Sequence, residues 1–141
     1  MTCSWAAHRL NGASSPISAA YSTPELTRQL KNIKAKALFT CVSLLATAYD
    51  AADAAGLPRK NVYLIDTPEK AWKDAKPPAD IKTVDQLVEE GRGMTELPRV
   101  KFAEGQGAKQ TAYLISSSGT SGLPVSTFTL TERVFVRDGG G

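Results

Sequence analysis

The sequence predicts an α/β fold in which helices alternate with short parallel strands. Two apolar runs of buried-strand length, residues 37–42 and 61–65, each follow a stretch with helical periodicity. A third apolar run, residues 110–115, leads into a loop rich in serine, threonine and glycine. Helix–strand alternation with short connections is typical of a sheet with parallel neighbours. We therefore expect all three strands to be parallel.

The first helix begins near Ser22. Ser22 or Thr23 can cap it, Pro24 suits its first turn, and Glu25 favours the positive end of the helix dipole. Apolar residues then recur at helical spacing, at Leu26, Leu30 and Ile33.

A second helix is expected between the first two strands. Ser43 can cap it, and Gly56 and Pro58 end it. One face of this helix is apolar, with Leu44, Leu45, Ala48, Ala52 and Ala55. The strand at 61–65 follows and closes at Asp66.

The middle of the chain is more polar. Residues 67–82, with three prolines and many charges, are interpreted as a surface loop. Thr83 and Gln86 have the spacing of a capping box, which predicts a short helix from Thr83 to Glu90 that stops at Gly91. Residues 92–108 are irregular in pattern.

Composition excludes several classes of function. The chain has 141 residues, enough for one domain, and a formal net charge of +3, too small to indicate nucleic acid or a membrane surface. The densest basic stretch is interpreted as a solvated helix face, with Arg28, Lys31, Lys34 and Lys36. No apolar run approaches the roughly 20 residues that span a bilayer.

Cysteine usage favours a reducing compartment. Cys3 and Cys41 have no C-x-x-C spacing, and with a single histidine, His8, they predict no metal site. The N-terminus lacks the pattern of a signal peptide, and the three C-terminal glycines are not a targeting tripeptide. We expect a cytoplasmic protein.

The segment that best indicates a function is the strand at 110–115 together with the loop that follows it. Glycines let backbone N–H groups approach a polyanionic phosphate, and serine and threonine hydroxyls add donors. A strand places such a loop at the carboxyl edge of a sheet, where α/β folds bind ligands. The loop is not a Walker A motif, because Pro124 and Val125 occupy the positions of its glycine and lysine. On these grounds alone a flexible Ser/Gly linker is an equally good interpretation.

A family resemblance favours the phosphate loop. The segment Ser117–Pro124, SSGTSGLP, resembles the signature loop of the adenylate-forming superfamily, which includes acyl-CoA synthetases, 4-coumarate–CoA ligases and luciferases. Residues 5–12, 15–22, 25–37 and 83–87 resemble, in order, the segments that precede that loop in 4-coumarate–CoA-ligase-like members. The resemblance covers residues 4–124.

The resemblance implies a fold and a two-step reaction. The expected fold is a partial parallel-sheet subdomain of the N-terminal domain of an AMP-binding ligase. ATP, with Mg²⁺, and a carboxylic acid form an acyl-adenylate and pyrophosphate, and coenzyme A then displaces AMP to give the thioester. The loop would hold the ATP β- and γ-phosphates, through Ser117, Ser118, Gly119, Thr120, Ser121 and Gly122.

Departures from the family pattern lower the expected activity. The family places lysine directly after Pro124, where this chain has Val125, and a cation facing a triphosphate is a large electrostatic contribution. The parts of the family downstream of the loop are absent, so we expect a fragment that is inactive alone and assign no catalytic residue. His8, the one candidate base, lies on a helix far in sequence from the loop, and a base must first be within reach of its substrate, so we assign it no catalytic role.

The alternative is a non-catalytic pseudoenzyme or a partner-binding remnant, with at most weak nucleotide binding and association through an exposed sheet edge. The match to the family stops at Pro124, which divides the chain into a partial AMP-binding domain, residues 1–124, and a tail, residues 125–141. The tail alternates apolar and polar residues without an evident strand partner. We expect it to be aberrant and poorly ordered, translated from a retained intron or a shifted frame.

Overall fold

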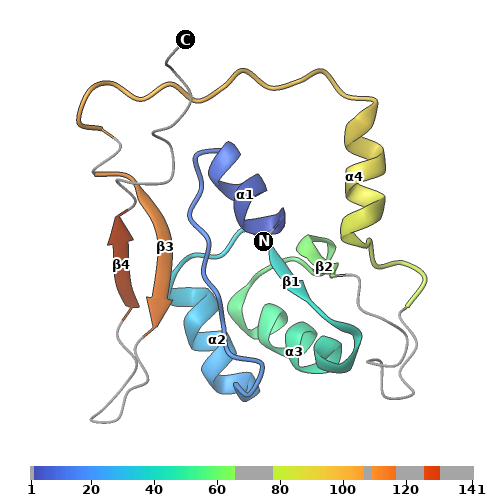
Figure 1. The fold of residues 1–141 in the computed structure, drawn as a ribbon. Coiled ribbons are helices and arrows are strands. Elements are labelled where there is room, and N and C mark those ends of the chain that lie inside the picture. Colours follow the sequence, from blue (N-terminus) through green and yellow to red (C-terminus); the bar gives the residue numbers. More distant parts are fainter. Residues whose placement is uncertain (1, 66–77, 107–108, 117–125, 131–141) are drawn as a thin grey trace. The chain divides into compact units, whose positions relative to one another are not determined.

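The computed structural model of the chain describes residues 2–65, 78–106, 109–116 and 126–130 (Figure 1). These residues belong to two compact units. One unit is residues 17–97, and the other combines residues 1–16 with residues 98–141.

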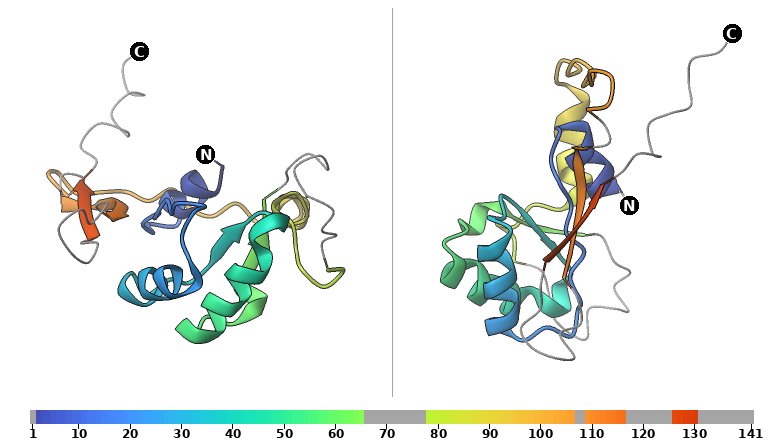
Figure 2. Two further views of the ribbon diagram at one scale, coloured as in Figure 1. Left: turned by 90° about the horizontal axis from the view of Figure 1, so that it is seen from below. Right: turned by 90° about the vertical axis from the view of Figure 1, so that its left-hand side faces the viewer.

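The unit of residues 17–97 has the predicted α/β order. Its elements are α2 (Thr23–Asn32), β1 (Leu38–Thr40), a 3₁₀ turn (Val42–Leu44), α3 (Leu45–Ala55), a second 3₁₀ turn (Arg59–Asn61), β2 (Val62–Leu64) and α4 (Val84–Arg92). Strands β1 and β2 are parallel, with Leu38 opposite Val62 and Thr40 opposite Leu64. The prediction of parallel strands is thus confirmed for the first two segments. Figure 2 shows α2 and α3 on the same side of this strand pair.

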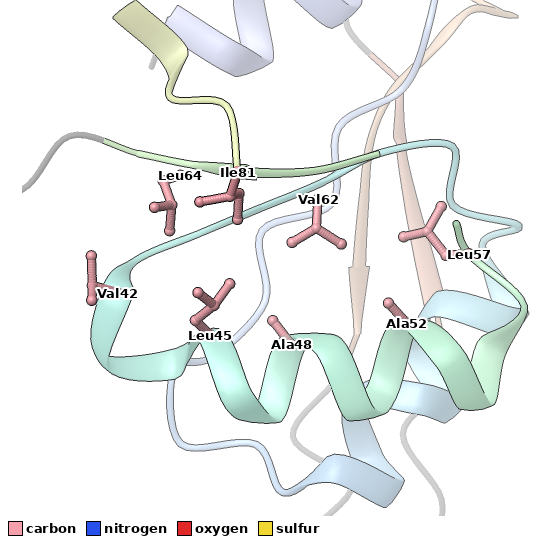
Figure 3. Packing of buried hydrophobic residues seen from close by; sticks show 8 residues of the cluster. All are labelled: Val42, Leu45, Ala48, Ala52, Leu57, Val62, Leu64 and Ile81. Carbon is pink, nitrogen blue, oxygen red and sulfur yellow. The ribbon is translucent and has the colours of Figure 1, made fainter. Parts of the chain in front are cut away.

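The core of this unit lies between α3 and the strands (Figure 3). Ala48 and Ala52 of α3 are 2% and 0% exposed, and their small side chains let the helix backbone approach the strands closely. The cluster consists of Val42, Leu45, Ala48, Ala52, Leu57, Val62, Leu64 and Ile81. A second, smaller cluster packs α2 against α3 through Leu26, Leu30 and Ala51.

The start of α2 agrees with the predicted capping residues, whereas the start of α3 does not. The Glu25 carboxylate accepts bonds from the Ser22 hydroxyl and backbone N–H, and these hydrogen bonds hold the pKa of Glu25 below its usual value. The prediction that Ser43 caps the next helix is wrong, because Val42–Leu44 forms a 3₁₀ turn and α3 begins at Leu45. Gly56 ends α3 as predicted, with φ of 76° in the left-handed region.

A side-chain cluster covers the C-terminal end of α3. The guanidinium of Arg59 donates to both carboxylate oxygens of Asp53 at 2.6–3.1 Å and lies over the ring of Tyr49. The hydrogen bonds to Arg59 lower the pKa of Asp53. Arg59 also offsets the unfavourable position of a carboxylate near the negative end of a helix dipole.

The predicted capping box of α4 is present. Gln86 N–H donates to Thr83 Oγ1 at 3.2 Å, and Thr83 N–H donates to Gln86 Oε1 at 2.9 Å. The predicted stop at Gly91 is wrong by a short distance, since the helix continues to Arg92 and its C-cap is Gly93. A Gly inside a helix weakens it but does not by itself end it.

Replacing Thr83 by alanine should lower the free energy of unfolding of the 17–97 unit by about 1 kcal/mol. The change removes the side-chain acceptor for the Gln86 N–H at the start of α4. Urea denaturation followed by circular dichroism measures this change in the free energy of unfolding. Thr83→Ser, which keeps the hydroxyl, is the matched control and should stay close to the unchanged protein. Equal losses in the two variants would show that the hydroxyl does not stabilise the helix.

The second unit is built around a β-hairpin. Its described elements are α1 (Thr2–Arg9), β3 (Thr111–Ser116) and β4 (Ser126–Leu130). The strand predicted at 110–115 is confirmed as β3, but its predicted parallel pairing with the first two strands is wrong. β3 pairs antiparallel with β4 in a separate two-stranded sheet. The partner is close in sequence, so this pairing closes a short loop at low entropic cost.

The start of the tail therefore has a strand partner that sequence analysis did not find. Ser126–Leu130 pairs with β3, from Ser116 opposite Ser126 to Thr111 opposite Leu130. Residues 131–141 lie outside the described part of the chain. The domain boundary at residues 124 and 125, and an origin of the tail outside the ligase reading frame, stay predictions.

Candidate phosphate-binding hairpin

The hairpin frames the predicted phosphate loop. Ser116, the last residue of β3, pairs with Ser126, the first residue of β4. Residues 117–125 connect these two positions and include every residue predicted to bind phosphate. The predicted residues, Ser117, Ser118, Gly119, Thr120, Ser121 and Gly122, lie outside the described residues, so the structure describes the base of the loop and not its interior.

The edge of β3 carries a short parallel contact with the N-terminal segment. The backbone N–H of Ser14 donates to the carbonyl of Ala112 at 2.8 Å, and the N–H of Leu114 donates to the carbonyl of Ser14 at 2.9 Å. The hydroxyl of Ser15 donates to the carbonyl of Leu114 at 2.8 Å. β3 is thus held by β4 and by the N-terminal segment, through two backbone hydrogen bonds of Ser14 and one hydroxyl hydrogen bond of Ser15.

His8 also contacts β3. Its Nε2 lies 2.9 Å from the carbonyl oxygen of Ala112, and its ring meets that of Tyr113 edge-on, with centroids 4.9 Å apart. A carbonyl oxygen only accepts hydrogen bonds, so Nε2 must carry the proton. The contact gives this nitrogen a hydrogen-bond partner on β3.

A turn after α1 brings His8 and Ser14 to the same strand. The N–H of Gly12 donates to the carbonyl of Ala7 at 2.8 Å, and a Cβ on Gly12 would lie 3.2 Å from that same oxygen. Asn11 takes a positive φ of 59°, a conformation that asparagine tolerates. The resemblance of residues 5–12 to a helix that ends in a glycine turn is borne out by this geometry.

Sequence reasoning missed the contacts of residues 8, 14 and 15 with β3. Their separations from their partners reach 104 residues, and no local spacing indicates such a pairing. Ser14 and Ser15 are of a residue type that is common in turns, and His8 is the single histidine of the sequence, so none of the three forms a recognisable motif.

A surface hollow of about 530 Å³ in the 17–97 unit is bordered by the ion pair of Lys82 with Glu90 at 2.8 Å and is lined by Ala79, Asp80, Ile81, Lys82, Gln86, Glu89 and Glu90. It contains none of the predicted site residues. Within the described ranges, no group of three histidine, cysteine or acidic side chains is placed to hold a metal ion. No described helix is long and apolar enough to cross a membrane.

Comparison with known proteins gives consistent matches over most of the chain. The sequence model of a family described as AMP-binding enzyme matches residues 1–125. Acyl-CoA ligase easD of Emericella nidulans is 36% identical over 84% of this chain, and acyl-CoA ligase AKT1 of Alternaria alternata is 39% identical over 84%. These matches cover 21% and 20% of the two relatives, so the chain spans about a fifth of their length.

Solved structures show a similar fold. A red-emitting luciferase from Phrixothrix hirtus superposes with a TM-score of 0.65 over 89% of this chain and 22% of its own, at 21% identity. The anthranilate CoA ligase AuaEII, solved with anthranoyl-AMP, superposes with a TM-score of 0.66 over 90% of this chain and 22% of its own, at 16% identity. At these identities the likeness concerns the fold alone.

Proposed function

The chain belongs to the AMP-binding enzyme family, and we propose that it provides the ATP-phosphate loop of an AMP-forming acyl-CoA ligase. The observation that carries the proposal is the loop SSGTSGLP at 117–124, directly between two paired strands. Pairing of Ser116 with Ser126 holds the two ends of the loop together. A closed loop of glycines and hydroxyl residues offers many donors to a phosphate and loses less entropy on binding than a free linker does.

Each residue type in the loop has a part in the proposed binding. Gly119 and Gly122 allow backbone N–H groups to approach the phosphate oxygens. Ser117, Ser118, Thr120 and Ser121 add hydroxyl donors. ATP with Mg²⁺ is the proposed ligand, and the β- and γ-phosphates are the groups that the loop would hold.

The proposed reaction of the whole enzyme is acyl-CoA formation from a carboxylic acid, ATP and coenzyme A. Adenylation releases pyrophosphate, and the coenzyme A thiol then displaces AMP. We assign no catalytic residue in this chain, which corresponds to about a fifth of its relatives. We expect phosphate binding without turnover from these 141 residues, in a cytoplasmic setting.

The pseudoenzyme or partner-binding alternative is the weaker proposal. The two relatives described above are ligases by name, and the chain is 36% and 39% identical to them over the matched residues. No described contact indicates a protein partner in place of a nucleotide.

The test is calorimetry of the 141-residue chain with ATP and with pyrophosphate. We expect weak binding, with a dissociation constant above about 1 μM, which corresponds to a binding free energy weaker than about −8 kcal/mol. Thr120→Ala removes one hydroxyl donor and should weaken binding about threefold to tenfold.

Thr95→Ala is the matched control, because Thr95 is exposed and lies outside the loop. It should leave the affinity unchanged. Equal effects of the two substitutions, or no binding of either ligand by the folded chain, would contradict a phosphate site at residues 117–122.

A further inference from the structure

We propose that the side of α1 that carries Trp5 is a docking surface for the part of an AMP-binding ligase that this chain does not span. The partner is about four-fifths of the ligase polypeptide, whether it continues the same chain or is a second one. The inference goes beyond the proposed function, because it rests on the family of the chain and not on the phosphate loop.

The polar side chains of α1 are used for contacts inside its own unit. The hydroxyls of Ser4 and Ser14 lie 2.9 Å apart, and His8 Nε2 donates to the carbonyl oxygen of Ala112 at 2.9 Å. Residues 2–8 contain no lysine, arginine, aspartate or glutamate. The helix therefore has no charged side chain to present to water before Arg9.

The large apolar side chains of this segment are left to solvent. Trp5 is 67% exposed, and Leu10, in the turn that follows the helix, is 64% exposed. No residue of α1 is buried. A surface helix ordinarily turns its apolar residues inward and its polar residues outward. α1 shows the reverse, which indicates that its outer side is made to be covered.

Tryptophan is well suited to anchor such a contact. Its side chain buries about 150–250 Å² when it enters an apolar site, and it has few rotatable bonds to immobilise. It is also among the residue types that contribute most to the affinity of protein interfaces. Trp5 is thus the residue of α1 on which docking should depend most.

The length of the relatives identifies the partner. The family model matches from residue 1, so α1 belongs to the domain that the family shares. The chain spans only about a fifth of easD and AKT1, so about four-fifths of the ligase polypeptide is available to cover the helix. Larger domains bury a larger fraction of their surface, and a helix exposed in a fifth of the polypeptide is expected inside the whole.

A second copy of this chain is a less favourable occupant. Trp5 and Leu10 from each copy would bury far less than the roughly 1,200–2,000 Å² of a stable protein interface. The remainder of a domain would contact the chain over many further residues, with α1 as one part of that surface.

The test combines the 141-residue chain with AKT1 from which the matched stretch is deleted and replaced by a flexible glycine–serine linker. Analytical ultracentrifugation measures whether a one-to-one complex forms. Circular dichroism reports whether each component is folded. The chain carries 5-fluorotryptophan and the substitution Trp72→Phe, so that residue 5 gives its one fluorine NMR signal.

We expect a complex in which the fluorine signal of residue 5 no longer responds to replacing H₂O by D₂O, because the indole has left water. Trp5→Gln should weaken the complex at least about thirtyfold, whereas Trp5→Phe, which keeps an apolar ring, should retain most of the affinity. The stability of the chain alone should not change in either variant, because Trp5 is mostly exposed.

Met94→Gln is the matched control. It removes an apolar side chain of similar exposure, 71%, that lies outside α1. It should change the affinity by less than about threefold. Equal losses from Met94→Gln and Trp5→Gln would overturn the role of α1, as would a fluorine signal that stays open to solvent in the complex.

The remaining outcomes decide the occupant. Absence of a complex would reject the ligase remainder, even if the shortened AKT1 stays unfolded, because the proposal requires this chain to complete the domain. Dimers of the chain alone that dissociate in Trp5→Gln would identify a second copy as the occupant instead. No ATP or pyrophosphate enters these measurements, so their failure and the failure of the phosphate site are distinguishable.

Discussion

Replacing Val125 by lysine should tighten the binding of ATP or pyrophosphate about tenfold to a hundredfold, because charge-assisted hydrogen bonds contribute about 1.5–3 kcal/mol. Val125 directly precedes Ser126, which pairs with Ser116 at the base of the loop. The resemblance places lysine at this position in the family. The glycine, serine and threonine residues of the loop already supply backbone and hydroxyl donors, whereas residues 117–125 contain no basic side chain. The substitution adds that positive charge.

Val125→Met is the control for side-chain length without charge, and it should leave the affinity near that of the unchanged chain. The gain with lysine should also shrink as ionic strength rises, since screening weakens an exposed charge pair. Calorimetry at two salt concentrations measures both effects. An equal gain with methionine, or a gain independent of salt, would show that the lysine does not act on the phosphate through its charge.

Replacing Leu30 by alanine should lower the free energy of unfolding of the 17–97 unit by about 2–5 kcal/mol. Leu30 is 2% exposed and joins α2 to α3 against Ala51, which is fully buried. Alanine at position 51 has no side chain long enough to fill the space that Leu30 would leave. The cost therefore includes a cavity as well as the lost transfer of apolar surface from water.

Leu97→Ala makes the same chemical change at a side chain that is 56% exposed. It should alter the free energy of unfolding by less than about 0.5 kcal/mol. Urea denaturation monitored by circular dichroism compares the two variants. Similar midpoints for both would mean that the contact of α2 with α3 is not part of the cooperative core.

Several features of the 17–97 unit follow from local sequence. The capping box of Thr83 with Gln86 sets the start of α4, and Gly56 sets the end of α3. These signals act over a few residues, where backbone hydrogen bonds and φ preferences dominate. The start of α3 departs from expectation, because Val42 turns into the core cluster and the chain makes a 3₁₀ turn before the helix begins.

The sequence by itself determined that the chain is an α/β protein, because periodicity and helix caps are local properties. It also predicted a phosphate-binding loop after an apolar strand, from the residue types of the loop and their resemblance to a family motif. Only the tertiary structure decided the partner of that strand. It paired β3 with β4 across the loop, placed an extra residue at Ala112, and brought His8 to its carbonyl. The hairpin partner is close in sequence, but strand-like alternation does not say which strand it pairs with. The contact of His8 with Ala112 spans 104 residues, and a lone histidine carries no spacing signal that predicts it.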